Sequence, residues 1–240
     1  MNAIQTILTT LFFTFLFSSS ATHGDDVRLP FKDCDARHYL KMPHQPALDS
    51  HLNVYLFAHV VLPNGKAVTI TKQGYGFVLD NRIVTNQHLT SLSRTFTTPD
   101  GTSISPTDFH YSYGATTYGC QRLHVRLDST SPEGFDIVTF STSDALPPGL
   151  EPGEMPMTGH RVSLYGHNGP LEGTVVGSGI DVDGLPFIPV RLDRDNTPGN
   201  SGLPAIDSYG KVIGVLRGHH GQDSRMARIV PIDALATLTP

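Results

Sequence analysis

Short β-rich segments separated by glycine, proline and turn residues are the feature that most limits how this chain can fold. The 240 residues include 23 Gly and 18 Pro, which interrupt the sequence at short intervals. Between these breaks, β-branched, aromatic and aliphatic residues predict strands over residues 51–62, 67–72, 76–79, 82–85, 121–127, 136–140, 161–165, 173–182, 187–192 and 211–217. Helical periodicity is confined to residues 232–238. The pattern predicts an all-β antiparallel barrel or sandwich with a short C-terminal helix.

The overall composition predicts a folded domain without a basic surface. Hydrophobic residues make up 38% of the chain and charged residues 16%, which is enough apolar material for a core. The formal net charge is -5, and the Lys and Arg residues are scattered along the sequence. Binding to nucleic acid or to an anionic membrane relies on clustered positive charge. We therefore expect no nucleic-acid partner and no stable membrane association, and we expect a monomer.

The N-terminal residues predict a signal peptide. Residues 4–17 are mostly apolar, but the stretch is too short and too interrupted for a membrane span. Small residues at 18–21 follow, and then the sequence becomes polar. This order predicts a signal peptide over residues 1–24, cleaved near Ala21 or Gly24, and therefore secretion. An uncleaved signal anchor is the alternative, because the first residues carry only the α-amino charge. Residues 25–47 would form an N-terminal segment of the mature chain.

Two cysteines, Cys34 and Cys120, leave their pairing open. Neither belongs to a Cys-x-x-Cys pair, so a thiolate zinc site is not indicated. In an oxidising compartment they could form one disulfide that ties the N-terminal segment to the first lobe. The alternative is two unpaired buried thiols, since the sequence does not define their separation. We expect neither a metal nor a cofactor.

The segment Thr197-Pro-Gly-Asn-Ser-Gly202 is the first motif with chemical meaning. A serine hydroxyl becomes a useful nucleophile when a base takes its proton and N–H donors hold the oxyanion that develops. Glycines on either side of Ser201 allow a tight turn that points amides into one small space. The amides of Gly199 and Ser201 are the candidate donors. Glycine-flanked serines also occur in ordinary turns, so the motif alone is a weak signal.

A histidine and an aspartate in similar contexts complete a candidate catalytic set. His88 follows the apolar strand predicted over residues 82–85, and imidazole is suited to general-base work near neutral pH. Asp136 opens the apolar segment Phe135-Asp-Ile-Val-Thr-Phe140. A carboxylate in that position is predicted to be partly buried and to need a partner, and the ring N–H of a histidine would supply one. The alternatives are a turn-capping role for Asp136, and Asp128 as the partner.

In this order and these contexts, the sequence resembles the chymotrypsin-fold (trypsin-like) serine proteases. It is most similar to the bacterial-type branch with the HtrA-type proteases and the glutamyl endopeptidases. The resemblance spans roughly residues 50–236 and is carried by five stretches: GYGFVLDNRIVTNQHL, FDIVTF, RVSLYGHNGP, IPVRLDRDNTPGNSGLPAIDSYGKVIGVLRG and ARIVPIDAL. Each motif is of moderate specificity, but five in the right order make a strong signal.

The resemblance implies two packed six-stranded antiparallel β-barrels with an active site between them. The first lobe would cover residues 48–145 and carry His88 and Asp136. The second lobe would cover residues 146–240 and carry Ser201, with an oxyanion hole at Gly199 and Ser201. The implied function is that of a secreted serine endopeptidase, which cleaves protein or peptide substrates through an acyl-enzyme.

One departure from the family keeps a second hypothesis open. Leu203 stands where most of the family has glycine, so its side chain must find room behind the nucleophile loop. The alternative function is therefore a catalytically silent binding protein on the same scaffold. An α/β-hydrolase esterase fits less well, because its Gly-x-Ser-x-Gly motif lacks the last glycine here and its triad has another chain order.

Four residues are candidates for the substrate-binding S1 pocket. Asp195 lies six residues before Ser201, the offset at which trypsin-like enzymes place the acid that receives Arg or Lys. In the alternative, Asp193 and Asp195 form salt bridges with Arg191 or Arg194. The other candidates are Thr197, Arg217, which could attract an acidic substrate residue, and His219.

Overall fold

The computed structural model describes residues 49–65, 67–92, 96–97, 103–105, 108–117, 121–131, 134–166, 169–181 and 184–238. The predicted signal peptide, the N-terminal segment over residues 25–47, Cys34 and Cys120 lie outside these residues. The elements whose bounds lie within these residues are β-strands and two short 3₁₀ helices, η2 (Gln87–Leu89) and η3 (Ile232–Thr237). No helix in the described part of the chain combines the length and the apolar character needed to cross a membrane.

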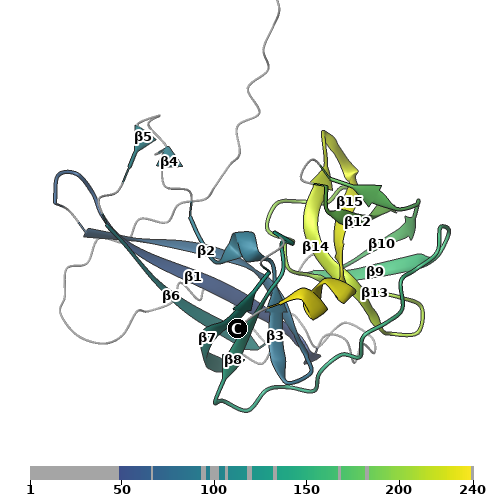
Figure 1. Ribbon diagram of the computed structural model, residues 1–240, viewed down its shortest axis with the longest axis horizontal. Coiled ribbons are helices and arrows are strands. Elements are labelled where there is room, and N and C mark those ends of the chain that lie inside the picture. The colour runs from purple at the N-terminus through teal and green to yellow at the C-terminus, as the bar shows by residue number, and fades with distance from the viewer. Residues whose placement is uncertain are drawn as a thin grey trace, which may run out of the picture.

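The first half of the described chain forms a closed six-stranded barrel (Figure 1). Its strands are β1 (His51–Val61), β2 (Ala67–Leu79), β3 (Arg82–Thr85), β6 (Asp108–Thr117), β7 (Arg122–Thr130) and β8 (Val138–Thr142). They are antiparallel in the order β1-β2-β3-β8-β7-β6, and pairing of β1 with β6 closes the barrel. The small hairpin of β4 (Phe96–Thr97) and β5 (Ser103–Ile104) stands apart from it.

The second half forms a second barrel beside the first (Figure 1). Its strands are β9 (Arg161–Gly166), β10 (Gly169–Val175), β12 (Pro186–Leu192), β13 (Pro204–Ile206), β14 (Val212–His220) and β15 (Asp223–Pro231). They run in the order β10-β9-β13-β14-β15-β12, pairing of β10 with β12 closes the ring, and β11 (Gly179–Ile180) extends the edge of β12. The predicted all-β, two-barrel architecture is confirmed. The predicted C-terminal helix is present as the 3₁₀ helix η3.

Strand β2 is longer than its sequence pattern predicts. Residues 67–72 and 76–79 were expected as separate strands, but β2 continues through Gly74 and Gly76. A Cβ on Gly74 would lie 2.3 Å from the Leu89 side chain, and one on Gly76 would lie 2.7 Å from the Val54 side chain. These glycines mark close approach of neighbouring groups rather than a break in the strand.

The Asp80-Asn81 turn joins β2 to β3. Both residues have positive φ, 50° and 59°. A two-residue hairpin with positive φ at both positions has the twist that antiparallel strands require, and Asn and Asp tolerate this conformation better than most residues. The turn directs β3 towards the segment that carries His88.

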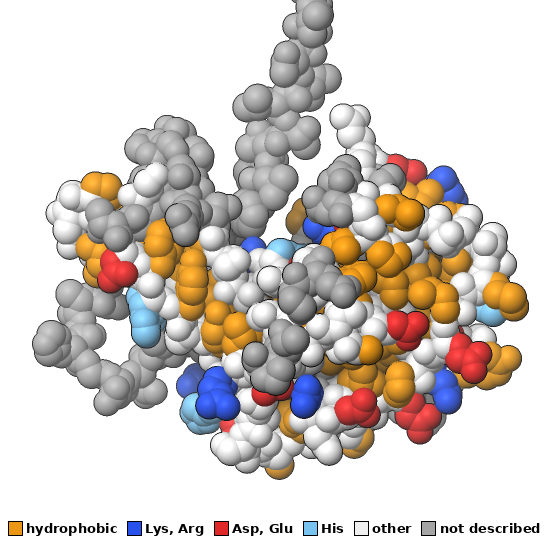
Figure 2. Space-filling model, in the orientation of Figure 1, with side chains coloured by type: hydrophobic (Ala, Val, Ile, Leu, Met, Phe, Trp, Pro, Cys, Tyr) orange, Lys and Arg blue, Asp and Glu red, His pale blue; other side chains and the backbone are white. Residues whose placement is uncertain are grey.

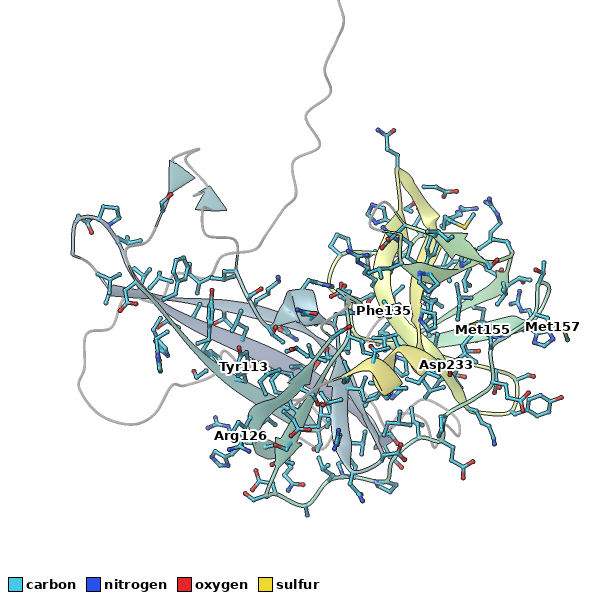
Figure 3. The ribbon with its side chains drawn as sticks, in the orientation of Figure 1. Tyr113, Arg126, Phe135, Met155, Met157 and Asp233 are labelled. Atoms are coloured by element: carbon cyan, nitrogen blue, oxygen red, sulfur yellow. The ribbon has the colours of Figure 1, made fainter. Side chains whose placement is uncertain are left out.

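Apolar side chains from both barrels fill the space between them. Phe77, Leu79 and Val84 of the first barrel belong to one buried cluster with Val212, Val215 and Val230 of the second. Phe135, which lies between the barrels in Figure 3, belongs to the same cluster. The Pro- and Gly-rich stretch over residues 146–153 also contacts both barrels, since Leu150 N donates to Val78 O and Gly153 N donates to Val212 O. The interface is therefore a shared core with main-chain hydrogen bonds at its edge.

Charged and apolar side chains are interspersed on the surface. On the face shown in Figure 2, Asp and Glu side chains alternate with Lys and Arg over the second barrel, and no basic stripe crosses this face. Several ion pairs join residues from different parts of this barrel, including Arg161 with Asp193 at 2.8 Å and Arg191 with Asp223 at 3.7 Å. Exposed pairs of this kind contribute little to stability, so packing carries most of the fold.

The loop that carries Ser201 is fixed between the two barrels by its main chain. Tyr75 N of β2 donates to Ser201 O at 2.8 Å, and Gly202 N donates to Leu216 O of β14 at 2.9 Å. Gly202 has a φ of +90°, and a Cβ there would lie 1.8 Å from Tyr75 O. Only glycine can take this backbone conformation at such a short distance from another main chain.

Leu203 finds room inside the second barrel. Its side chain is 0% exposed and belongs to the core cluster of that barrel. It packs beside Gly166, where an added Cβ would lie 3.3 Å from Leu203 Cδ1. The buried Leu203 side chain therefore anchors the Ser201 loop to the core of the second barrel. Gly166 and Gly202 have no side chains and leave space for this loop.

We expect Leu203→Ala to lower the free energy of unfolding by about 2–5 kcal/mol, because it opens a cavity in a fully buried site. Urea unfolding followed by far-ultraviolet circular dichroism measures the loss. Leu238→Ala is the matched control, since Leu238 is only partly buried at the edge of the inter-barrel cluster and should cost less. Equal losses for the two variants would show that Leu203 is not a core anchor.

We expect Gly202→Ala to destabilise the protein more than Gly199→Ala. Both glycines have positive φ, +90° and +98°, but a Cβ on Gly199 meets nothing within 4 Å. Alanine at position 199 should therefore cost only the left-handed strain of about 1–2 kcal/mol, whereas alanine at 202 also collides with Tyr75 O. Scanning calorimetry gives the two melting temperatures. A Gly202→Ala variant as stable as Gly199→Ala contradicts the close inter-barrel contact.

Candidate active site

His88 lies on η2, immediately after β3, at the edge that faces the second barrel. The buried Asn86 precedes it, and the Asn86 side-chain amide donates to Asp136 O at 2.8 Å. The Lys72 ammonium group on β2 donates to His88 O. Burial lowers the pKa of Lys72, while the Asp136 charge acts in the opposite direction. Lys72 therefore holds the main chain of His88, and Asn86 ties the residue before η2 to Asp136.

The Asp136 carboxylate holds His88 with both of its oxygens. Oδ2 lies 2.6 Å from His88 Nδ1, and Oδ1 accepts the main-chain N–H of His88 at 2.7 Å. Burial alone would raise the pKa of Asp136, but the hydrogen bonds from His88, the positive charge that its imidazole carries when protonated, and the charge of Arg217 lower it below its ordinary value. An ionised carboxylate can only accept, so Nδ1 carries the ring proton and Nε2 presents its lone pair.

The structure brings Asp136, and not the rival Asp128, to His88. Asp136 has a side chain only 6% exposed, just before β8. Asp128 lies on β7, where its carboxylate is 3.5 Å from Arg82 Nη1. The inference from the apolar strand that follows Asp136 therefore selected the residue that contacts the histidine.

Ser201 reaches the same region from the second barrel. A Cβ on Gly74 would lie 2.3 Å from the Leu89 side chain and 3.0 Å from Ser201 O, so the neighbour of His88 and the serine main chain pack on one glycine. The Ser201 hydroxyl donates to Arg217 O at 3.2 Å. Arg217 Nε in turn lies 3.3 Å from Asp136 Oδ2. Ser201 is thus connected through Arg217 to the carboxylate that holds His88.

The predicted oxyanion-hole residues lie on the turn that leads into Ser201. Gly199 adopts a φ of +98°, and the space beside its Cα is open. Within the described part of the chain, neither Gly199 N nor Ser201 N donates a main-chain hydrogen bond. Two main-chain donors on one tight turn are the arrangement that an oxyanion needs.

The candidate S1 residues other than Arg217 lie on the surface of the second barrel. The Asp195 carboxylate is 65% exposed, accepts from Ser224 Oγ at 2.9 Å and lies 3.1 Å from Arg225 Nε. Hydrogen bonds from Ser224 and Arg225 lower the pKa of Asp195 below its ordinary value. Thr197 and His219 are exposed. Asp195 is therefore an exposed, paired acid and not the buried carboxylate that the offset suggests.

Asp193 and Asp195 form salt bridges, as the alternative predicted, but their partners are not the expected Arg191 and Arg194. Asp193 contacts Arg161 of β9, with 2.8 Å between Oδ2 and Nη2, and Asp195 contacts a residue of β15. Arg191 pairs with Asp223. In each case the partner comes from another strand, because the folded barrel brings side chains together that are far apart in the sequence.

The structure adds two charged residues that sequence reasoning missed. Asp181 Oδ2 lies 2.9 Å from Arg217 Nη1 and 2.8 Å from Arg228 Nη2. Asp181 comes from the segment after β11, and Arg228 from β15, so nothing in the local sequence connects them. The guanidinium of Arg217 is thus shared by two carboxylates, Asp136 and Asp181. Among the residues described, no three His, Cys, Asp or Glu side chains are grouped as metal ligands.

Comparison with known proteins finds likeness in structure and none in sequence. No family model matches the chain, and no curated protein matches it. The active form of the Rv3671c protease from M. tuberculosis superposes with a TM-score of 0.56 at 21% identity, covering 79% of this chain and 79% of that one. The HtrA-type protease AlgW, solved with a decapeptide, gives 0.58 at 15% identity over 79% of this chain and 63% of that one.

A serine endoprotease from Yersinia pestis gives a TM-score of 0.55 at 16% identity, covering 82% of this chain and 65% of that one. At such identities the likeness concerns the fold. The two barrels and their strand order agree with the resemblance carried by the sequence motifs. The chain therefore has the chymotrypsin-like fold of the HtrA-type serine proteases.

Proposed function

We propose that the chain is a serine endopeptidase that hydrolyses peptide bonds through an acyl-enzyme, with Ser201 as nucleophile and His88 as its base. The observation that carries the proposal is the buried Asp136 carboxylate, which holds His88 with both oxygens beside the loop of Ser201. An orienting acid, a histidine with a free Nε2 and a serine on a tight glycine turn are the parts that acyl transfer requires.

In acylation, Ser201 Oγ attacks the carbonyl carbon of the scissile bond while its proton passes to His88 Nε2. The hydroxyl, which donates to Arg217 O at 3.2 Å, must first turn towards the imidazole. Loose geometry of this kind is common in unliganded sites and tightens when substrate binds. The carbonyl oxygen becomes an oxyanion held by the Gly199 and Ser201 amides. The C–N bond then breaks as His88 returns its proton to the leaving amine.

Deacylation repeats the sequence with water. His88 Nε2 takes a proton from the water as the oxygen attacks the ester carbon, and the same two amides hold the second oxyanion. The bond between the acyl carbon and Ser201 Oγ breaks, and His88 gives the proton back to the serine. Throughout, the Asp136 carboxylate keeps the proton of the free histidine on Nδ1 and stabilises the imidazolium when it forms.

The proposed substrates rest on the structural neighbours, and the proposed localisation rests on the sequence. Peptide substrates are proposed because the structural neighbours are serine proteases, one of them solved with a decapeptide. Secretion rests on the signal-peptide pattern of residues 1–24, and the Cys34–Cys120 disulfide is proposed only as a consequence of secretion. We further propose that the enzyme acts as a monomer.

The alternative of a silent binding protein rested on Leu203. That side chain is fully buried and belongs to the apolar core of the second barrel. The feature that suggested a disturbed nucleophile loop is thus accounted for by core packing. The endopeptidase is the function that the geometry supports better.

We expect Ser201→Ala to abolish covalent labelling by a fluorophosphonate probe and to reduce casein cleavage by at least about a thousandfold, because the attacking oxygen is removed. Gel fluorescence and mass spectrometry of the labelled peptide measure the first effect, and release of acid-soluble peptide measures the second. Ser208→Ala is the control, since Ser208 lies in an exposed turn of the second barrel.

Labelling that survives in Ser201→Ala, or that disappears in Ser208→Ala, would contradict the assignment of the nucleophile. If the folded wild-type protein neither takes the label nor cleaves casein between pH 7 and 9, the endopeptidase proposal is wrong and the binding protein becomes the better account.

A further inference from the structure

Four charged side chains form an alternating chain beside the candidate active site. Asp136 Oδ2 lies 3.3 Å from Arg217 Nε, Arg217 Nη1 lies 2.9 Å from Asp181 Oδ2, and Asp181 Oδ2 lies 2.8 Å from Arg228 Nη2. Asp136 and Asp181 are 6% and 4% exposed. The two acids and two arginines balance each other, which is the condition for keeping such charges out of water.

Arg217 is the member of this chain that joins the two barrels. Its guanidinium contacts Asp136 of the first barrel and Asp181 of the second, while its main-chain carbonyl accepts the Ser201 hydroxyl. A guanidinium is planar, permanently charged and able to bind two carboxylates in fixed directions. One residue therefore contacts both the nucleophile and the acid that orients the base.

Arg217 approaches the same Asp136 oxygen that accepts the ring proton of His88. Asp136 Oδ2 accepts the Nδ1 proton at 2.6 Å, and the same oxygen faces Arg217 Nε. The positive charge draws part of the electrostatic attraction of that oxygen away from the imidazole. It also restricts rotation of the carboxylate, whose other oxygen is fixed by the His88 main-chain N–H.

We propose that Arg217 is a positioning residue of the protease: it orients the Asp136 carboxylate for His88 and sets the pH range in which His88 can act as a base. The proposal rests on the proposed peptidase function and deepens it. We propose it in place of the expectation that Arg217 receives an acidic substrate residue, because its Nε and Nη1 already contact carboxylates of the protein.

The direction of the electrostatic effect follows from the groups that face the His88–Asp136 pair. Lys72 of β2 and Arg217 of β14 are the cations that act on Asp136, and Asp181 and Arg228 stand behind Arg217. Removing the charge of Arg217 leaves the Asp136 carboxylate more negative towards His88. The protonated imidazole is then favoured, so the base is switched off at a higher pH.

We expect Arg217→Gln to move the acid limb of the kcat/KM profile upward by about one pH unit. Loss of carboxylate orientation should lower kcat by about tenfold to a hundredfold, with a smaller change in KM. Arg217→Lys keeps the charge but not the planar fork, so it should retain the wild-type acid limb and recover only part of kcat. Arg161→Gln is the matched control, because it breaks an arginine–aspartate pair of the same barrel at its surface. It should leave the whole profile unchanged.

The measurements use the purified protein and a fluorogenic peptide, with active-site titration by a fluorophosphonate so that kcat refers to folded enzyme. A purely structural role would lower the titrated fraction without moving the acid limb. If the single variant does not fold because Asp181 loses one of its two arginine partners, Arg217→Gln/Asp181→Asn removes one charge of each sign and keeps the cluster neutral. A folded variant with the wild-type acid limb and wild-type kcat per titrated site overturns the proposal.

A second readout separates this proposal from the peptidase function itself. The C2–H proton resonance of His88, assigned with a His88→Gln variant, reports protonation of the imidazole whether or not the protein cleaves peptides. Its midpoint should rise in Arg217→Gln and stay unchanged in Arg161→Gln. If the wild-type protein has no activity but this difference is seen, the peptidase proposal fails and the electrostatic role of Arg217 stands. If the midpoint does not move, the role of Arg217 is refuted.

Discussion

The active-site region depends on the contact between the main chain of the Ser201 loop and strand β2. Ser201 O accepts the N–H of Tyr75, and Gly202 lies so close to Tyr75 O that no side chain fits at that position. This contact fixes the nucleophile of the second barrel to a strand of the first. Because β2 leads through the Asp80-Asn81 turn into β3 and then to His88, the position of the base follows from the same strand. Burial of Leu203 beneath the loop adds an anchor from the second barrel.

Charge interactions stabilise the site that these main-chain contacts position. The Asp136 carboxylate is buried, so it must be compensated, and His88, Arg217 and the more distant Lys72 supply the compensation. A buried carboxylate whose pKa is held below its ordinary value stays ionised at neutral pH, as an orienting acid must. Joining Arg217 to Asp181 and Arg228 extends the charge balance into the second barrel. Asp136 and Arg217 therefore belong both to the balanced buried charge cluster and to the proposed catalytic site.

Local sequence signals predicted the parts of the structure that depend on local chemistry. The glycine- and proline-broken β pattern and the apolar strand after Asp136 each have a physical signature in neighbouring residues. The continuous strand β2 was missed, because Gly74 and Gly76 look like breaks until the groups packed against them are known. The contact of Arg217 with Asp181 and the surface position of Asp195 depend on how distant strands lie side by side. No spacing along the chain encodes these contacts, so only the folded structure reveals them.

The central claim is that Ser201, His88 and Asp136 act as one unit across the junction of the barrels. A crystal structure with a peptidyl boronic acid tests it most directly, because boron mimics the tetrahedral intermediate. We expect a covalent bond from boron to Ser201 Oγ, a boronate oxygen at the Gly199 and Ser201 amides, and His88 Nε2 within hydrogen-bond distance of the adduct while Nδ1 stays on Asp136. A boronate bound elsewhere, or an imidazole that remains out of reach of the adduct, would contradict the account.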